Sequence, residues 1–98
     1  MPPGVLYHCT TPRKARRYRE SGAIKAPVRG FDTLLAAMAW CIKTGRTVIY
    51  RIEHQDPADV HKLPDHHSEF GAAWWIDSDV SCDCIVCCFS AGPGDHWL

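Results

Sequence analysis

The sequence predicts an α+β fold in which two helices pack on a small, mainly antiparallel sheet. Three observations lead to this prediction. Two helix signatures lie in the first half of the chain, each with a capping residue before it and a glycine after it. Short apolar or alternating segments precede, separate and follow these helices, as strands do. The chain has only 98 residues, which allows one domain.

The first strand is expected over Val5–Thr10. Thr11 is a good N-cap and Pro12 suits the first position of a helix, which should run to Ser21 and end at Gly22. The next segment, residues 24–29, should be a short edge strand or an extended loop, because its proline cannot donate a hydrogen bond to a ladder.

The second helix is expected over residues 34–42, with Asp32 or Thr33 as its cap and Gly45 as its stop. Its residues are apolar nearly all round. Such a helix should be buried against the sheet.

Four later segments read as strands. Residues 47–53 alternate, residues 60–63 are a short extended piece, and residues 72–76 follow a polar, turn-rich stretch. Residues 84–89 form a continuous apolar run, which predicts a central, buried strand. The domain should therefore cover residues 1–90, and residues 91–98 should form a flexible tail rich in glycine and proline.

The charge of the chain excludes strong attraction of the whole molecule to nucleic acid or to membranes. Eleven basic and eleven acidic residues give a formal net charge of zero. The basic residues are unevenly distributed, however, and five of them crowd residues 13–19. This segment could contact the diphosphate of a nucleotide or, more weakly, a nucleic-acid backbone.

No segment is long and apolar enough to span a bilayer, and the N-terminal residues lack the pattern of a signal peptide. We therefore expect a cytoplasmic protein with reduced thiols. Six cysteines in so short a chain also fit a disulfide framework, but such a framework needs export.

A histidine and a threonine lie two residues apart on the first strand. His8 and Thr10 should point to the same face, because side chains alternate along an extended chain. A polar pair near the end of a strand often belongs to a ligand site. The simpler interpretation is that His8 bonds a backbone group within the sheet.

Three motifs together resemble the front half of the ADP-ribosyltransferase-like fold. They are Tyr-His-Cys-Thr at residues 7–10, Gly-Phe-Asp-Thr at residues 30–33 before an alanine-rich helix, and the strand at residues 48–52. The RNA 2'-phosphotransferase and small toxin branches are the most similar. The resemblance implies a site for NAD, in which a first-strand histidine holds the nicotinamide ribose. It also implies an aromatic or hydroxyl residue that flanks the nicotinamide, and a late-strand glutamate that assists transfer of ADP-ribose.

Carried over to this chain, His8 matches the first-strand histidine and Thr10 its hydroxyl companion. Phe31 and Thr33 match the segment that flanks the base. Thr33 is also, more simply, a helix cap. Arg13 lies in the first turn of the basic helix, nearest the expected cleft, and would bind the diphosphate.

The late-strand glutamate has no clear match. Residues 72–76 lie where it should be and contain no acid, whereas Glu69 lies just before them and Glu53 ends an earlier strand. Glu69 is the candidate that would stabilise positive charge on the ribose, and it could equally be a loop carboxylate.

Two other functions stay open from the sequence. The first is a catalytically inert interaction module of the phage or toxin–antitoxin type. In it the exposed member of the Trp74/Trp75 pair and the basic face of residues 13–19 contact a protein partner or a second copy. The second is a zinc or thiol-redox protein, suggested by the cysteines of residues 82–88 and by four nearby histidines. Neighbouring strand positions point apart, so no metal ligands are assigned.

Overall fold

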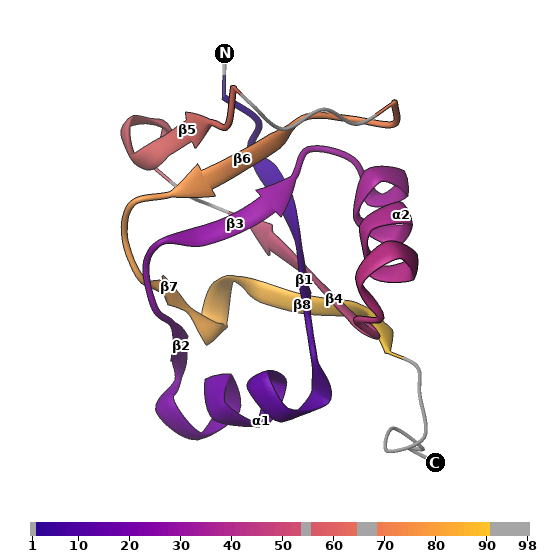
Figure 1. Cartoon of the computed structure of the whole chain (residues 1–98). Coiled ribbons are helices and arrows are strands. Elements are labelled where there is room, and N and C mark those ends of the chain that lie inside the picture. The colour runs from indigo at the N-terminus through magenta and orange to yellow at the C-terminus, as the bar shows by residue number, and fades with distance from the viewer. Residues whose placement is uncertain (1, 54–55, 65–68, 91–98) are drawn as a thin grey trace.

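The computed structural model describes residues 2–53, 56–64 and 69–90 and confirms the α+β fold, with two helices and antiparallel strands (Figure 1). The elements run in the order β1 (Val5–Thr10), α1 (Pro12–Ser21), β2 (Ala23–Ile24), β3 (Val28–Phe31), α2 (Leu34–Thr44), β4 (Val48–Glu53), β5 (Val60–Lys62), β6 (Ala73–Ile76), β7 (Val80–Ser81) and β8 (Ile85–Ser90). Two short 3-10 helices, Pro57–Asp59 and Cys82–Cys84, precede β5 and β8. The expected tail, residues 91–98, lies outside the described residues.

The main sheet consists of two halves that meet at β1. Its strand order is β5-β6-β3-β1-β4-β8, and β2 and β7 form a separate two-stranded sheet. Strand β1 pairs with β4 at every position from Val5 to Thr10. Among the described residues it pairs with β3 at Tyr7↔Phe31 alone. The two strands therefore diverge beyond this point, next to His8.

The helices cover opposite faces of the sheet. The α2 residues Ala36, Ala37 and Cys41 share a core with Cys9 of β1. On the other face, Ala15 of α1 packs with Val48 and Tyr50 of β4. Figure 1 shows α2 beside the sheet and α1 near the β2–β7 ribbon. No helix in the described part of the chain is both long and apolar enough to cross a membrane.

The ends of both helices are fixed by local chemistry. The Thr11 hydroxyl accepts a hydrogen bond from the backbone of Lys14 at 3.2 Å, and Gly22 ends α1 at φ 80°. At α2, Thr33 rather than Asp32 is the cap. Gly45 ends α2 at φ 74°. These positive φ angles favour glycine because it has no Cβ.

Asp32 instead joins the start of α2 to β6. Its carboxylate accepts hydrogen bonds from the backbone N–H of Ala72 at 2.8 Å and from the indole N–H of Trp74 at 3.2 Å. Thr33 donates to the carbonyl oxygen of Phe70 at 2.6 Å. Gly71 therefore passes between two polar side chains with no room for a side chain of its own.

The expected position of the segment at residues 24–29 is wrong. Strand β2 ends at Ile24 and β3 begins at Val28, and β3 lies between β6 and β1 rather than at an edge. Pro27 precedes β3, so the ladder needs no donor from it.

The last apolar run is not a central strand either. Strand β8 lies at an edge of the sheet, where Val86 and Phe89 are 50% and 42% exposed. The preceding Cys82–Cys84 forms a 3-10 turn instead of continuing the strand. A continuous apolar run predicts burial on both faces, and here one face of an edge strand stays open.

Helix α2 is buried on one face only. Its opposite face exposes a stripe of large apolar side chains, and Ile42 is 84% exposed. We call this the α2 stripe; its members are Leu34, Leu35, Met38 and Ile42.

We predict that Gly71→Ala destabilises the fold. A Cβ at residue 71 would lie 2.6 Å from both Asp32 Oδ1 and Thr33 Oγ1, so the α2 start would have to shift. We expect a loss of about 1–3 kcal/mol in the free energy of unfolding, measured by urea titration. Gly4→Ala is the matched control because a Cβ there meets no atom within 4 Å. Equal stability of the two variants would contradict this account of the α2 start.

Candidate functional site

His8 lies in a chain of hydrogen bonds where β1 and β3 separate. Its Nδ1 is 2.6 Å from the carbonyl oxygen of Arg29, which can only accept, so Nδ1 carries the proton and donates. Its Nε2 is then the acceptor for the Tyr18 hydroxyl at 3.2 Å. The Thr10 hydroxyl donates to the same Tyr18 oxygen at 3.3 Å. Arg29 of β3 and Tyr18 of α1 thus fix the imidazole in a single tautomer.

The surroundings of His8 favour its neutral form. Burial lowers the pKa of His8 from its ordinary value of 6.5, and the charges of Arg46 and Lys14 lower it further, against the opposing hydrogen bond to Arg29. A neutral imidazole is consistent with the hydrogen bonds above, because Nε2 accepts one. His8 is therefore suited to hold a hydroxyl group rather than to bind an anion by its own charge.

An open cleft of about 690 Å³ lies beside His8 and Tyr18. Its lining is strongly basic. One carboxylate, that of Glu20, faces five cationic side chains: Lys14, Arg17, Lys25, Arg29 and Arg46. We call this space the His8 cleft.

A smaller cavity of about 180 Å³ shares His8, Arg29 and Arg46 with the His8 cleft. Aromatic rings line it, with Phe31 and Trp40 in tilted contact at 5.9 Å between centroids. We call it the aromatic cavity. A charged space and an aromatic space thus border on the same three residues.

The path of the backbone explains why the two spaces meet here. A Cβ at Gly30 would lie 3.1 Å from Leu6 Cβ and from the Tyr7 carbonyl oxygen, so β3 approaches β1 closely at this point. Since the strands pair only at Tyr7↔Phe31 in the described chain, the sheet opens directly afterwards. Arg46 spans the opening and donates to the carbonyl oxygen of Cys9 at 3.1 Å.

Three of the residues expected to bind a cofactor are brought together. His8 and Phe31 both line the aromatic cavity. Thr10 is fully buried and reaches the cleft only through Tyr18. Phe31 is buried among the residues of the α2 core.

The other three expected residues lie elsewhere. Arg13 is exposed and is not among the residues lining either space. Thr33 acts as the α2 cap and is held by Phe70. Glu69 is exposed beside Phe70 and is also not among the lining residues, so the described carboxylate of the cleft is that of Glu20.

The most informative residues of the site were not predicted. Tyr18 packs against the core through its ring, and its hydroxyl completes the hydrogen-bond chain to His8. Arg29 and Arg46 come from segments far from His8 in sequence. No sequence pattern marks them, because the sheet register brings them to the cleft.

The tryptophan pair divides as expected between the two faces of β6. Trp74 packs against the core, whereas Trp75 contacts His61 with 4.6 Å between ring centroids. Trp75 is not among the residues that line the two spaces at His8. The tryptophan that lines the aromatic cavity together with His8 is Trp40.

The described part of the chain forms no recognisable metal site. Within residues 2–53, 56–64 and 69–90, no group of three or more histidine, cysteine or acidic residues could hold an ion. His54, His66 and His67 lie outside the described residues. No disulfide joins the described thiols, which are those of Cys9, Cys41, Cys82, Cys84 and Cys87.

Comparisons with protein-family models, with curated proteins and with solved structures find no match to this chain. Function therefore has to be inferred from the two spaces at His8 and from the resemblance of the first-strand motif.

We predict that His8 makes the fold less stable in mild acid. Its pKa is lowered in the folded state, so as the pH falls below 6.5 the unfolded chain takes up the additional proton first, and the free energy of unfolding decreases. His8→Gln removes this contribution. Urea titrations at about pH 7.5 and about pH 5.5 should show a smaller decrease for the variant than for the wild type. Equal decreases would show that His8 does not titrate abnormally.

Proposed function

We propose that the protein binds a phosphorylated nucleotide in the His8 cleft, with NAD as the ligand that the sequence resemblance favours. The observation that supports this proposal is the pairing of a basic cleft with an aromatic cavity around one neutral histidine. A dinucleotide needs both, because its diphosphate is anionic and its bases are flat and aromatic.

Positive charge is concentrated at the cleft, although the protein as a whole carries no net charge. Five of the eleven basic residues line the cleft. Lys25 pairs with Asp79 at 3.4 Å. Lys14, Arg17 and Arg29 form no ion pair with any residue in the described ranges, so their charge is available to a ligand.

His8 would orient the ligand through a hydroxyl group. Its Nε2 already accepts a hydrogen bond from Tyr18, and a ribose hydroxyl would replace that donor at the same nitrogen. The Tyr18 ring stays packed against the core, and its hydroxyl proton can turn to another acceptor when a ligand hydroxyl takes its place.

Transfer of ADP-ribose is the further step of the proposal. It would need a carboxylate near the ribose to stabilise developing positive charge. Glu69 is the candidate from the resemblance, and Glu20 is the carboxylate that lines the cleft. If the protein is active, loss of nicotinamide release in Glu20→Gln or in Glu69→Gln identifies which one assists.

We predict that Arg17→Gln weakens NAD binding roughly tenfold or more, because the diphosphate loses a charge-assisted hydrogen bond. Titration calorimetry on the reduced, metal-free protein measures this. Arg13→Gln is the matched control: it removes the same charge from the same helix, outside the cleft, and should bind NAD as the wild type does.

His8→Ala should abolish binding, with thermal unfolding used to confirm that the variant is folded. Unchanged NAD binding in folded His8→Ala would overturn the proposal. Release of nicotinamide, assayed in the same samples, decides whether the protein is an enzyme or a binding protein.

A second candidate function is the inert interaction module, and the α2 stripe favours it. The stripe carries no charge, and a helix face of this kind can pair with itself about a two-fold axis. A second copy is the occupant we propose, because a chain of zero net charge does not repel its own copies.

We predict that Ile42→Lys converts the self-associated protein to a monomer in sedimentation experiments, because a charge at the most exposed apolar position opposes burial. Lys43→Gln alters the neighbouring residue outside the stripe and should leave the association unchanged. A wild-type monomer at high concentration would exclude this candidate.

A further inference from the structure

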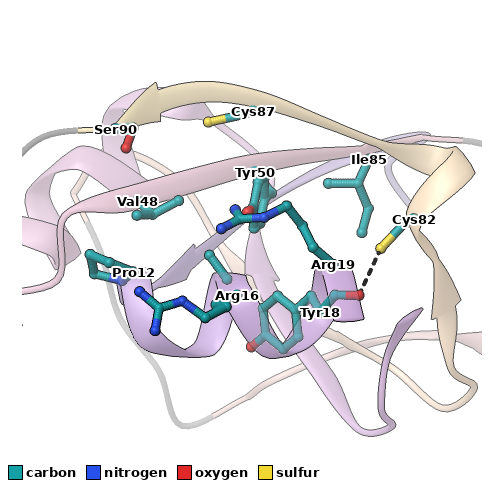
Figure 2. Close-up of a pocket in the computed structure, with 11 residues that line it drawn as sticks. Pro12, Arg16, Tyr18, Arg19, Val48, Tyr50, Cys82, Ile85, Cys87 and Ser90 are labelled. Carbon is teal, nitrogen blue, oxygen red and sulfur yellow. Dashed lines mark hydrogen bonds between the residues drawn. The ribbon is translucent and has the colours of Figure 1, made fainter. Parts of the chain in front are cut away.

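A second groove lies on the other side of Tyr18, between α1 and the strands β4 and β8 (Figure 2). Its volume is about 360 Å³. We call it the α1 groove. No part of the proposed nucleotide site uses it, and among the described residues Tyr18 alone lines both the α1 groove and the His8 cleft.

The polar side of the α1 groove carries positive charge. Arg16 and Arg19 line it, and none of the described lining residues carries a carboxylate. The charge of Arg19 acts on the Tyr50 hydroxyl, and Figure 2 shows the two side chains together in the middle of the groove. Ser90 adds a second hydroxyl at the β8 end.

The hydroxyl group of Tyr50 can act as a hydrogen-bond donor in the groove. Its side chain is buried, with 8% of the residue exposed. Burial raises the pKa of Tyr50 above its ordinary value of 10.0, although the charge of Arg19 opposes this shift. The hydroxyl therefore keeps its proton at neutral pH and can donate to an anion.

The other walls of the α1 groove are apolar. Ala15 and Val48 are almost fully buried beneath it, and Pro12, Ile85 and the thiols of Cys82 and Cys87 also line it. Tyr18 and Tyr50 add aromatic rings, with 6.3 Å between their centroids. A ligand that fills this space needs an anionic head and an apolar body.

We propose that the α1 groove is a second binding site, which takes a small phosphate monoester with an aromatic body. The phosphate would lie between Arg16 and Arg19 and accept hydrogen bonds from the hydroxyls of Tyr50 and Ser90. The aromatic body would pack on the apolar wall. Guanidinium groups suit this head because their planar donors match phosphate oxygens in pairs.

Helix α1 separates this site from the His8 cleft. Lys14 and Arg17 line the cleft only, whereas Arg16 and Arg19 line the groove only. The Tyr18 hydroxyl points to His8 and Thr10, away from the groove lining. Both sites can therefore be filled at once, and the proposal holds whether or not the cleft binds NAD.

Phenyl phosphate is the probe for this site, with binding measured by titration calorimetry on the whole chain. We expect saturable binding that weakens roughly tenfold or more in Arg19→Gln and in Arg16→Gln. Phenol lacks the phosphate and should not bind. Arg13→Gln and Arg17→Gln are matched controls on the same helix and should bind as the wild type does, and thermal unfolding checks the fold of every variant.

Two outcomes would overturn the proposal. One is the absence of saturable binding at millimolar phenyl phosphate. The other is weaker binding in Arg17→Gln but not in Arg16→Gln or Arg19→Gln, which would place the ligand in the His8 cleft. Repeating the titration with NAD present separates the two sites: unchanged affinity supports independent sites, and competition would place both ligands in one.

Discussion

The pairing of β1 with its two neighbours is the constraint on which the site depends. Strand β1 is held by β4 along its whole length but by β3, within the described chain, only at Tyr7↔Phe31. A sheet bonded continuously on both sides would have no opening. Here the strands separate at His8. The carbonyl oxygen of Arg29 accepts a hydrogen bond from the imidazole Nδ1–H rather than from a backbone N–H of β1. The site is thus a consequence of the sheet register.

Helix α1 lies between two of the cavities, the His8 cleft and the α1 groove. Ala15 is its buried residue and Tyr18 also packs against the core, while basic side chains lie to either side. Basic residues spaced by three positions share a side of a helix, so Lys14 and Arg17 reach one cavity while Arg16 and Arg19 reach the other. Tyr18 lies between them. The composition of α1 suggests only a solvated basic face. In the structure its basic side chains line two different cavities.

The chemistry of the His8 cleft favours binding over catalysis. Its histidine is neutral and fully hydrogen-bonded, and its charges are almost all positive. Under the proposed function, such a site would recognise an anion and orient a hydroxyl group. A transfer reaction would also need a carboxylate at the reacting carbon, so the enzymatic part of the proposal depends on Glu20 or Glu69, whereas the binding part does not.

The sequence by itself determined what is local. Thr11 and Thr33 begin the helices and Gly22 and Gly45 end them, because caps and left-handed turns depend on neighbouring backbone groups. The tertiary structure alone decided that β3 is central, that β8 is an edge strand and that Arg29 and Arg46 meet His8. These features depend on register between distant segments. An apolar run or a lone arginine has the same local appearance at the centre of a sheet and at its edge, so only the assembled fold distinguishes them.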